Sequence, residues 1–205
     1  MPIRSSVVRL VTSCLVLACA ACSGAQPAPA AVAPSPAPVA QAPSAESSEP
    51  LASPSLPSPT LAVPAGARLA FALDAKGVQI YACQAAEAGF GWTLKAPEAT
   101  LADRQGQIVV KHYAGPTWEW LADGSKVEAS KLQAFSDDAG SIPKLLLKVN
   151  KHEGQGRLSD VTYIQRLATT RGLAPATGCD AAHLDAVERV EYTATYYFYR
   201  GDTQG

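Results

Sequence analysis

The residues best suited to chemistry gather in the stretch from Lys111 to Trp120. His112 and Glu119 supply an imidazole and a carboxylate, two of the groups that exchange protons in general acid–base catalysis. Between them, Gly115-Pro116 predicts a turn that would join two strands and bring both side chains near each other. His112 and Glu119 are therefore a candidate catalytic or ligand-binding pair.

Two tryptophans flank Glu119. If a strand resumes after the turn, Trp118 and Trp120 lie on one of its faces and Glu119 on the other, because side chains alternate along a strand. One interpretation buries both tryptophans in the core and leaves Glu119 solvated or paired with Lys111. The other interpretation exposes a tryptophan, whose ring then stacks on a sugar or an aromatic ligand.

The binding interpretation makes Tyr113, Trp118 and Arg166 the candidate ligand contacts. The rival interpretation as an enzyme sets a geometric requirement, which is that His112 and Glu119 face one concave pocket beside Arg166. If the pair moves protons in such a pocket, the protein is a hydrolase or an isomerase.

Other well-defined chemistries lack their motifs. The sequence contains no G-x-S-x-G elbow, no G-x-x-x-x-G-K-S/T loop, no H-E-x-x-H pair and no G-x-G-x-x-G after a strand. His112, His152 and His183 fall in separate segments, so their spacing gives no evidence for a metal site, and we expect neither a metal nor a cofactor. The 17 Lys and Arg balance 18 Asp and Glu without forming a basic stripe, which argues against nucleic acid as a partner.

The elements that must position these residues are strands. All 14 aromatic residues (3 Trp, 7 Tyr and 4 Phe) lie from Phe71 onward, so we predict a packed domain over residues 66–200, followed by a polar tail over 201–205. Turn residues such as Ala75-Lys76-Gly77 divide the domain, and only Asp180–Glu188 has helical character. Alternating apolar residues and β-branched or aromatic enrichment predict about nine short strands. These strands cover Arg68–Leu73, Val78–Cys83, Gly91–Lys95, Ile108–Tyr113, Thr117–Leu121, Lys126–Ala134, Leu145–Lys151, Leu158–Ala168 and Tyr192–Arg200. The pattern predicts an all-β fold, an antiparallel β-sandwich or barrel with at most one short helix.

The closing segment, Tyr192–Tyr199, is apolar or aromatic on both of its faces. Tyr196 and Phe198 lie on one face, and Tyr197 and Tyr199 lie on the other. We therefore expect a central strand, or a strand whose outer face is covered by a loop.

The N-terminus carries the features of an export signal, and residues 1–21 are predicted to be a signal peptide. Two arginines precede the apolar run Leu10–Ala21, which is too short to span a bilayer because a spanning helix needs about 20 apolar residues. Small residues precede Cys22 and Cys19, and both surroundings resemble the bacterial lipobox, whose cysteine is lipidated. We expect lipidation at Cys22, with Cys19 as the alternative, and hence a protein exported to the periplasm, outer membrane or cell surface and anchored there in a membrane.

Residues 22–65 are predicted to be a disordered tether. The part from Gln26 to Ala65 holds 11 of the 16 prolines and no aromatic residue. Alternation of proline with Ala and Ser favours extended polyproline II structure, with a reach of up to about 120 Å at ~3.1 Å per residue.

Cys83 and Cys179 are the two cysteines of the predicted packed domain. An oxidising compartment favours a disulfide bond between them, and the alternative is two buried free thiols.

Several motifs of the domain occur together. They are Tyr81-Ala82-Cys83, His112-Tyr113-Ala114-Gly115-Pro116-Thr117-Trp118-Glu119, Asp123-Gly124-Ser125, Ile142-Pro143, Val161-Thr162-Tyr163-Ile164-Gln165-Arg166, Ala174-Pro175 and Tyr196-Tyr197-Phe198-Tyr199. Over nearly all of residues 66–200 the chain resembles a family of secreted bacterial and fungal proteins that is described as a domain of unknown function, number 3455. The resemblance implies no established activity.

The expectation from the sequence is therefore an exported, lipid-anchored β module of the cell envelope that binds a small ligand or a partner, such as an envelope glycan or protein. The alternatives are a hydrolase or isomerase that uses His112 and Glu119, and a purely structural lipoprotein.

Overall fold

The computed structural model describes residues 52–87 and 89–201. The predicted signal peptide, both candidate lipidation cysteines (Cys19 and Cys22), most of the predicted tether and residues 202–205 of the tail lie outside the described residues. In the described part of the chain, no helix is long and apolar enough to cross a membrane.

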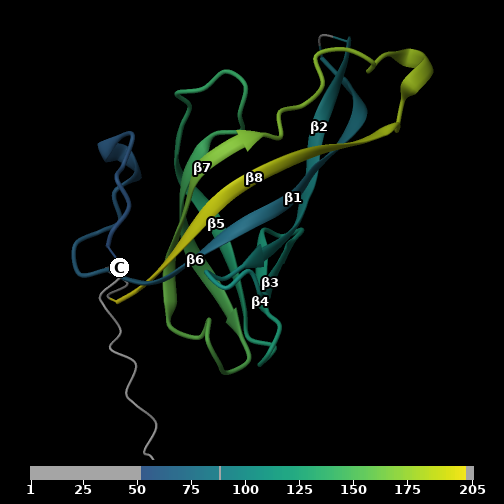
Figure 1. Cartoon of the computed structure of the whole chain (residues 1–205). Coiled ribbons are helices and arrows are strands. Elements are labelled where there is room, and N and C mark those ends of the chain that lie inside the picture. The colour runs from purple at the N-terminus through teal and green to yellow at the C-terminus, as the bar shows by residue number, and fades with distance from the viewer. Residues whose placement is uncertain (1–51, 88, 202–205) are drawn as a thin grey trace, which may run out of the picture. The chain divides into compact units, whose positions relative to one another are not determined.

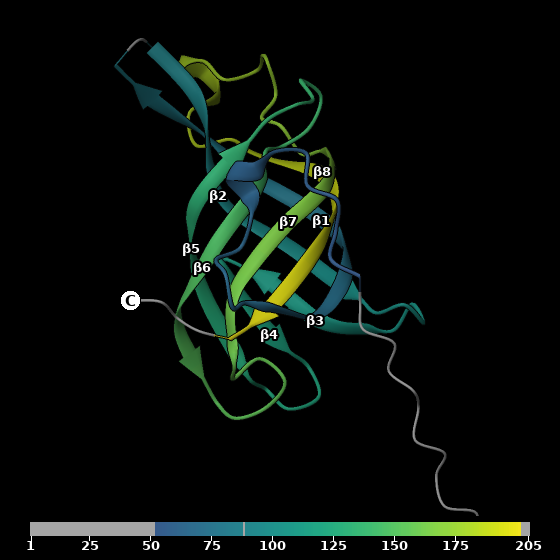
Figure 2. The same ribbon diagram turned by 90° about the vertical axis from the view of Figure 1, so that its left-hand side faces the viewer.

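The domain is all-β, as predicted, and its strands form one closed antiparallel barrel (Figures 1 and 2). Each strand pairs with the next along the chain, and the last strand closes on the first. The strands are β1 (Arg68–Ala86), β2 (Gly89–Ala102), β3 (Ile108–Tyr113), β4 (Thr117–Trp120), β5 (Lys126–Phe135), β6 (Lys144–Glu153), β7 (Val161–Arg171) and β8 (Val187–Arg200). Two short 3-10 turns complete it, η1 (Pro59–Leu61) and η2 (Ala181–His183).

The first two predicted strands are one strand, β1, because the turn predicted at Ala75-Lys76-Gly77 does not form. Gly77 lies inside the ladder, between Ala99 of β2 and Tyr192 of β8. A Cβ atom at this position would lie 2.2 Å from the carbonyl oxygen of Glu98. The glycine therefore permits a close approach between strands, which is one of the recognised uses of glycine within a strand.

Strand β2 is longer than predicted and includes Pro97. It pairs with β1 along its whole length, but with β3 only over Ala99–Ala102. At Pro97, β2 is therefore paired with β1 but not with β3. The absence of an N–H group from proline removes no hydrogen bond to β3.

The stretch Asp180–Glu188 forms only the single turn η2. Asp180 caps this turn by accepting hydrogen bonds from the backbone N–H groups of Ala182 and His183. Asp185 then adopts a left-handed conformation with φ 64° and donates its N–H to the carbonyl of Cys83. The chain is thereby drawn onto β1, and β8 begins at Val187.

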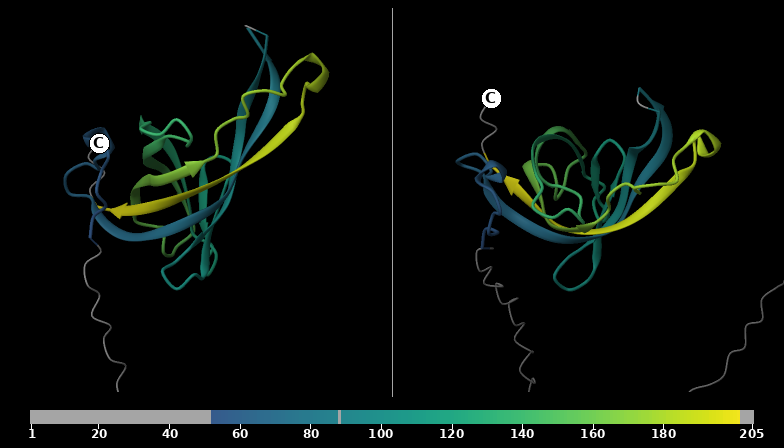
Figure 3. Two further views of the ribbon diagram at one scale, coloured as in Figure 1. Left: turned by 45° about the horizontal axis from the view of Figure 1, so that its top comes forward. Right: turned by 90° about the horizontal axis from the view of Figure 1, so that it is seen from above.

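The ends of β1, β2 and β8 near this turn extend away from the barrel as a long arm (Figure 3). A disulfide bond between Cys83 of β1 and Cys179 of the loop before η2 ties the arm to that loop, with 5.2 Å between the Cα atoms. The arm is also held by Trp92, whose Nε1 donates a hydrogen bond to the carbonyl of Thr177 at 2.9 Å.

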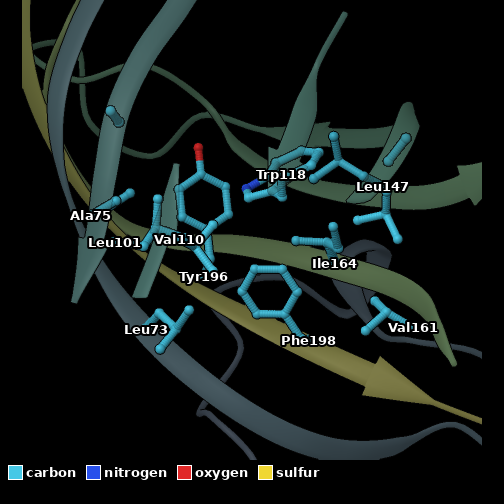
Figure 4. Close-up of a cluster of buried hydrophobic side chains, with 14 of the residues drawn as sticks. Leu73, Ala75, Leu101, Val110, Trp118, Leu147, Val161, Ile164, Tyr196 and Phe198 are labelled. Atoms are coloured by element: carbon cyan, nitrogen blue, oxygen red, sulfur yellow. The ribbon is translucent and has the colours of Figure 1, made fainter. Parts of the chain in front are cut away.

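The core lies inside the barrel and consists of the side chains that point inward from alternating strand positions (Figure 4). Members labelled there include Leu73, Ala75, Leu101, Val110, Trp118, Leu147, Val161, Ile164, Tyr196 and Phe198. Phe71 and Phe198 stack with their ring centroids 4.7 Å apart, and Trp120 packs edge-on against Phe71. These aromatic rings fill one part of the barrel interior.

A second cluster lies on the outside, where the segment before β1 crosses β7 and β8 (Figure 2). Leu61 is fully buried there against Leu146, Tyr163, Leu167 and Tyr199. Burial of one leucine contributes roughly 1.5–3 kcal/mol. The outer face of β8 is thus covered by a loop, one of the two arrangements that the sequence suggests.

The same contact is reinforced by hydrogen bonds. Gln165 donates from Nε2 to the carbonyl of Leu61 at 2.6 Å and accepts from the Tyr199 hydroxyl at 2.6 Å. Residues near Leu61 fall within the predicted tether, yet this end of the segment packs on the barrel.

Candidate ligand-binding cavity

The turn after β3 places His112 and Glu119 on opposite sides of the barrel wall. His112 pairs with Trp118 across β3 and β4, and Lys111 pairs with Glu119. Because side chains alternate, His112 and Trp118 point into the barrel while Glu119 points outward. The two candidate acid–base groups therefore do not share a pocket.

Glu119 instead belongs to a group of side chains on the outer surface. Its Oε2 accepts a hydrogen bond from the Tyr113 hydroxyl at 2.9 Å and lies 3.7 Å from Nζ of Lys126. Tyr113 thus also lies outside the barrel, away from Arg166.

A cavity of about 320 Å³ occupies the part of the barrel interior that the core leaves unfilled. Its aromatic and polar lining residues are Gln79, Tyr81, His112, Trp118, Lys131, Arg166 and Tyr196. Its apolar lining residues are Leu94, Pro97, Pro116, Ala134, Ile142, Pro143, Leu145, Leu147 and Leu173. Every strand contributes at least one of these residues, so closure of the barrel assembles the cavity.

His112 is fixed in one orientation. Its ring stacks on Trp118 with centroids 4.2 Å apart and an interplanar angle of 11°, and it meets Tyr196 edge-on at 5.5 Å. Nδ1 lies 2.9 Å from the carbonyl oxygen of Thr117. A carbonyl only accepts, so Nδ1 carries the hydrogen, and Nε2 keeps a lone pair that can accept a hydrogen bond.

The environment keeps this imidazole neutral. Burial lowers the pKa of His112 to about 3, and the positive charge of Arg166 lowers it further, against the opposing effect of the hydrogen bond to Thr117. General bases work best with a pKa near the operating pH, so His112 is poorly suited to proton transfer near neutrality. It is well suited to accept a hydrogen bond from a ligand.

Two buried donors of the cavity wall have no hydrogen-bond partner in the described residues, Nε2 of Gln79 and Nε1 of Trp118. Gln79 is 2% exposed and Trp118 is 1% exposed. A buried donor left unsatisfied costs about 1–3 kcal/mol, so such groups call for an explanation. Both atoms have almost no accessible surface, so they lie within the packed wall and not at its open face.

Arg166 brings a positive charge to the same wall. Its Nε and Nη2 donate to the carbonyl of Pro143 at 3.2 and 2.8 Å. Ile142, which precedes that proline, donates its N–H to the carbonyl of Arg171, so the loop that holds the guanidinium is itself fastened to the end of β7.

Three residues proposed from the sequence thus meet in the cavity, namely His112, Trp118 and Arg166. Gln79 was not predicted as a site residue. In the uninterrupted strand β1, alternation from Phe71 places Gln79 inward. The turn predicted at Ala75-Lys76-Gly77 broke this alternation, so no orientation could be predicted for Gln79. In the residues that the structure describes, no group of three or more His, Cys, Asp or Glu side chains is arranged to hold a metal ion.

Comparison with known proteins gives one match. The model of a family described as "Protein of unknown function (DUF3455)" matches residues 64–200, which is the whole barrel. No curated protein and no solved structure matches the chain.

Proposed function

The chain belongs to the family described as protein of unknown function (DUF3455), and we propose that its barrel is an exported binding module that holds a small, largely apolar ligand. The observation that carries this proposal is the cavity of about 320 Å³, whose mostly apolar wall carries a few polar groups, among them His112 and Arg166.

Barrel size supports the proposal. An eight-stranded barrel has an interior just wide enough to be filled by side chains or to hold one small ligand. Here Phe71, Phe198 and Trp120 fill one part, while the part beside His112 stays open. An apolar pocket with a few convergent polar groups is the usual form of a small-molecule site.

The site geometry favours binding over catalysis by His112 and Glu119. The neutral imidazole lies inside the barrel, whereas Glu119 is hydrogen-bonded to Tyr113 outside it. The pair that a hydrolase or isomerase of this design would need is therefore not assembled. A concave, mostly apolar site of this size also fits a small molecule better than a glycan or a protein surface.

We further propose that the module is anchored in a cell-envelope membrane by a lipid on Cys22, or on Cys19. The signal-like N-terminus and the lipobox resemblance support export. The disulfide between Cys83 and Cys179 also supports it, because such bonds persist in oxidising compartments.

The binding proposal is tested with N-phenylnaphthylamine, a neutral apolar dye that fluoresces in apolar surroundings. The purified protein should bind the dye in the cavity, and Ala134→Trp should abolish binding because Ala134 lines the cavity from an exposed position. Ala85→Trp is the matched control, since Ala85 is exposed on β1 and does not line the cavity. Equal dye binding by both variants would contradict the proposal.

The anchoring proposal is tested by labelling cells with a radioactive fatty acid. The wild-type protein and the Cys19→Ala variant should carry the label, and Cys22→Ala should lose it together with its membrane association. Loss of the label in Cys19→Ala alone would assign the lipid to Cys19. A protein that stays unlabelled in wild-type cells would refute lipid anchoring.

A further inference from the structure

Positive charge in the cavity has no counter-charge among the lining residues. Arg166 and Lys131 both line the cavity, and no lining residue is an aspartate or a glutamate. Arg166 takes part in none of the ion pairs found in the described residues. Lys131 is exposed, but Arg166 is half-buried among apolar side chains, so an anion bound in the cavity would stabilise this guanidinium.

The hydrogen-bonding groups of the wall call for a ligand rich in acceptors. Arg166 uses Nε and Nη2 on the single carbonyl of Pro143. A guanidinium has five N–H groups, so further donors remain for a ligand. A carboxylate offers several lone pairs and matches the fork of a guanidinium, which makes it the fitting headgroup.

The remaining wall is apolar and therefore selects against small hydrated anions. Leu94, Ile142, Leu145, Leu147 and Leu173 provide no polar group that could replace the water around phosphate or sulfate. A volume of about 320 Å³ also lies near the lower end of the range for ligand pockets, roughly 300–1,000 Å³. The favoured molecule is compact and mostly apolar.

We infer that the cavity selects a small organic carboxylate with an apolar body, and that Arg166 binds its carboxylate group. This inference rests on the proposed binding function and names the chemical class of its ligand. The apolar body would lie against the leucines, and the carboxylate would meet Arg166.

The test compares naphthoate with naphthamide, its uncharged counterpart, as competitors of the neutral dye on the full-length protein at neutral pH. Wild-type protein should bind naphthoate more tightly than naphthamide. Arg166→Gln should weaken naphthoate binding roughly 10- to 100-fold, the range expected for loss of a charged hydrogen bond, and leave naphthamide binding unchanged. Lys111→Gln is the matched control, because Lys111 is an exposed cation on the outer face of β3.

Other outcomes separate the two proposals. If the dye binds and naphthamide binds as tightly as naphthoate, the carboxylate inference fails while the binding function stands. If neither the dye nor either naphthalene compound binds, the binding function fails. Inorganic phosphate that competes as well as naphthoate would overturn the requirement for an apolar body.

A second variant that keeps the positive charge makes the test independent of whether Arg166→Gln folds. Arg166→Lys should retain a preference for naphthoate over naphthamide, with weaker binding because a lysine lacks the guanidinium fork. If Arg166→Gln does not fold, the acid-over-amide preference of the wild-type protein decides the inference, and its absence would overturn it.

Discussion

Acidification from pH 6.5 to about pH 3.5 is expected to lower the free energy of unfolding by about 4 kcal/mol through His112 alone. The folded-state pKa of this imidazole is about 3 because of burial, against an ordinary value of 6.5. Between these values the unfolded chain binds a proton that the folded protein does not bind. The free energy of unfolding therefore rises with pH across the window, by about 1.4 kcal/mol per pH unit. The stabilising contribution of the neutral His112 disappears as the pH falls through the same window.

Urea denaturation between about pH 6 and pH 5 measures this slope above the range in which the carboxylates contribute most. Asp123, Asp138 and Asp180 have pKa values lowered from 3.8 by hydrogen bonds, and Glu153 has a pKa lowered from 4.5 by its hydrogen bond with Lys151, so these carboxylates also destabilise the fold in acid, mainly below that window. His112→Asn should remove the His112 contribution to the slope, because an amide can donate to Thr117 without titrating. His183→Asn is the control that removes an exposed histidine instead. Identical slopes in wild type and His112→Asn would show that His112 is not held neutral by burial.

Much of the barrel could be predicted because its residues follow the period of two that a strand requires. In β8, Tyr196 and Phe198 lie inside and Tyr199 lies outside, as the alternation predicts. Prediction failed where a single residue has two meanings. A glycine such as Gly77 is typical of a turn, but here it permits close contact between β1 and β2. The need for a glycine at this position depends on Ala99 of β2, which is more than 20 residues away in the sequence and becomes its neighbour only in the sheet.

Contacts outside the barrel were harder to predict for a related reason. Leu61 stands in a stretch rich in proline, where composition favours an extended tether. Its burial depends on a hydrophobic patch formed by Tyr163, Leu167 and Tyr199, which exists only once β7 and β8 are paired. Local composition carries no information about such a patch.

The candidate site was predicted in part for the same physical reason. Alternation alone separates His112 from Glu119. His112 pairs with Trp118 across the turn, and Glu119, the next residue after Trp118, points to the opposite face of the sheet. Proximity in sequence suggested the wrong partner. The partner that the fold supplies is Arg166, on β7, which reaches the cavity only because the barrel closes.

Replacement of Trp118 by alanine is expected to lower the free energy of unfolding by about 3–5 kcal/mol, the range for a buried aromatic residue. The Trp118 side chain is 1% exposed, stacks on His112 and meets the Tyr196 ring edge-on with 5.6 Å between the ring centroids. Figure 4 shows Trp118 and Tyr196 as neighbours in the core. Removal of the Trp118 side chain would leave a void that is continuous with the existing cavity. Trp92→Ala is the matched control, because Trp92 lies near the start of β2 and is only partly buried.

Trp118→Phe distinguishes the packing role of this ring from the role of its N–H group. Nε1 has no partner in the described residues, so phenylalanine keeps an aromatic ring against His112 and removes a buried unsatisfied donor. We therefore expect Trp118→Phe to cost far less stability than Trp118→Ala in urea denaturation at neutral pH. A cost below about 1 kcal/mol for Trp118→Ala would mean that the ring is not part of the packed core.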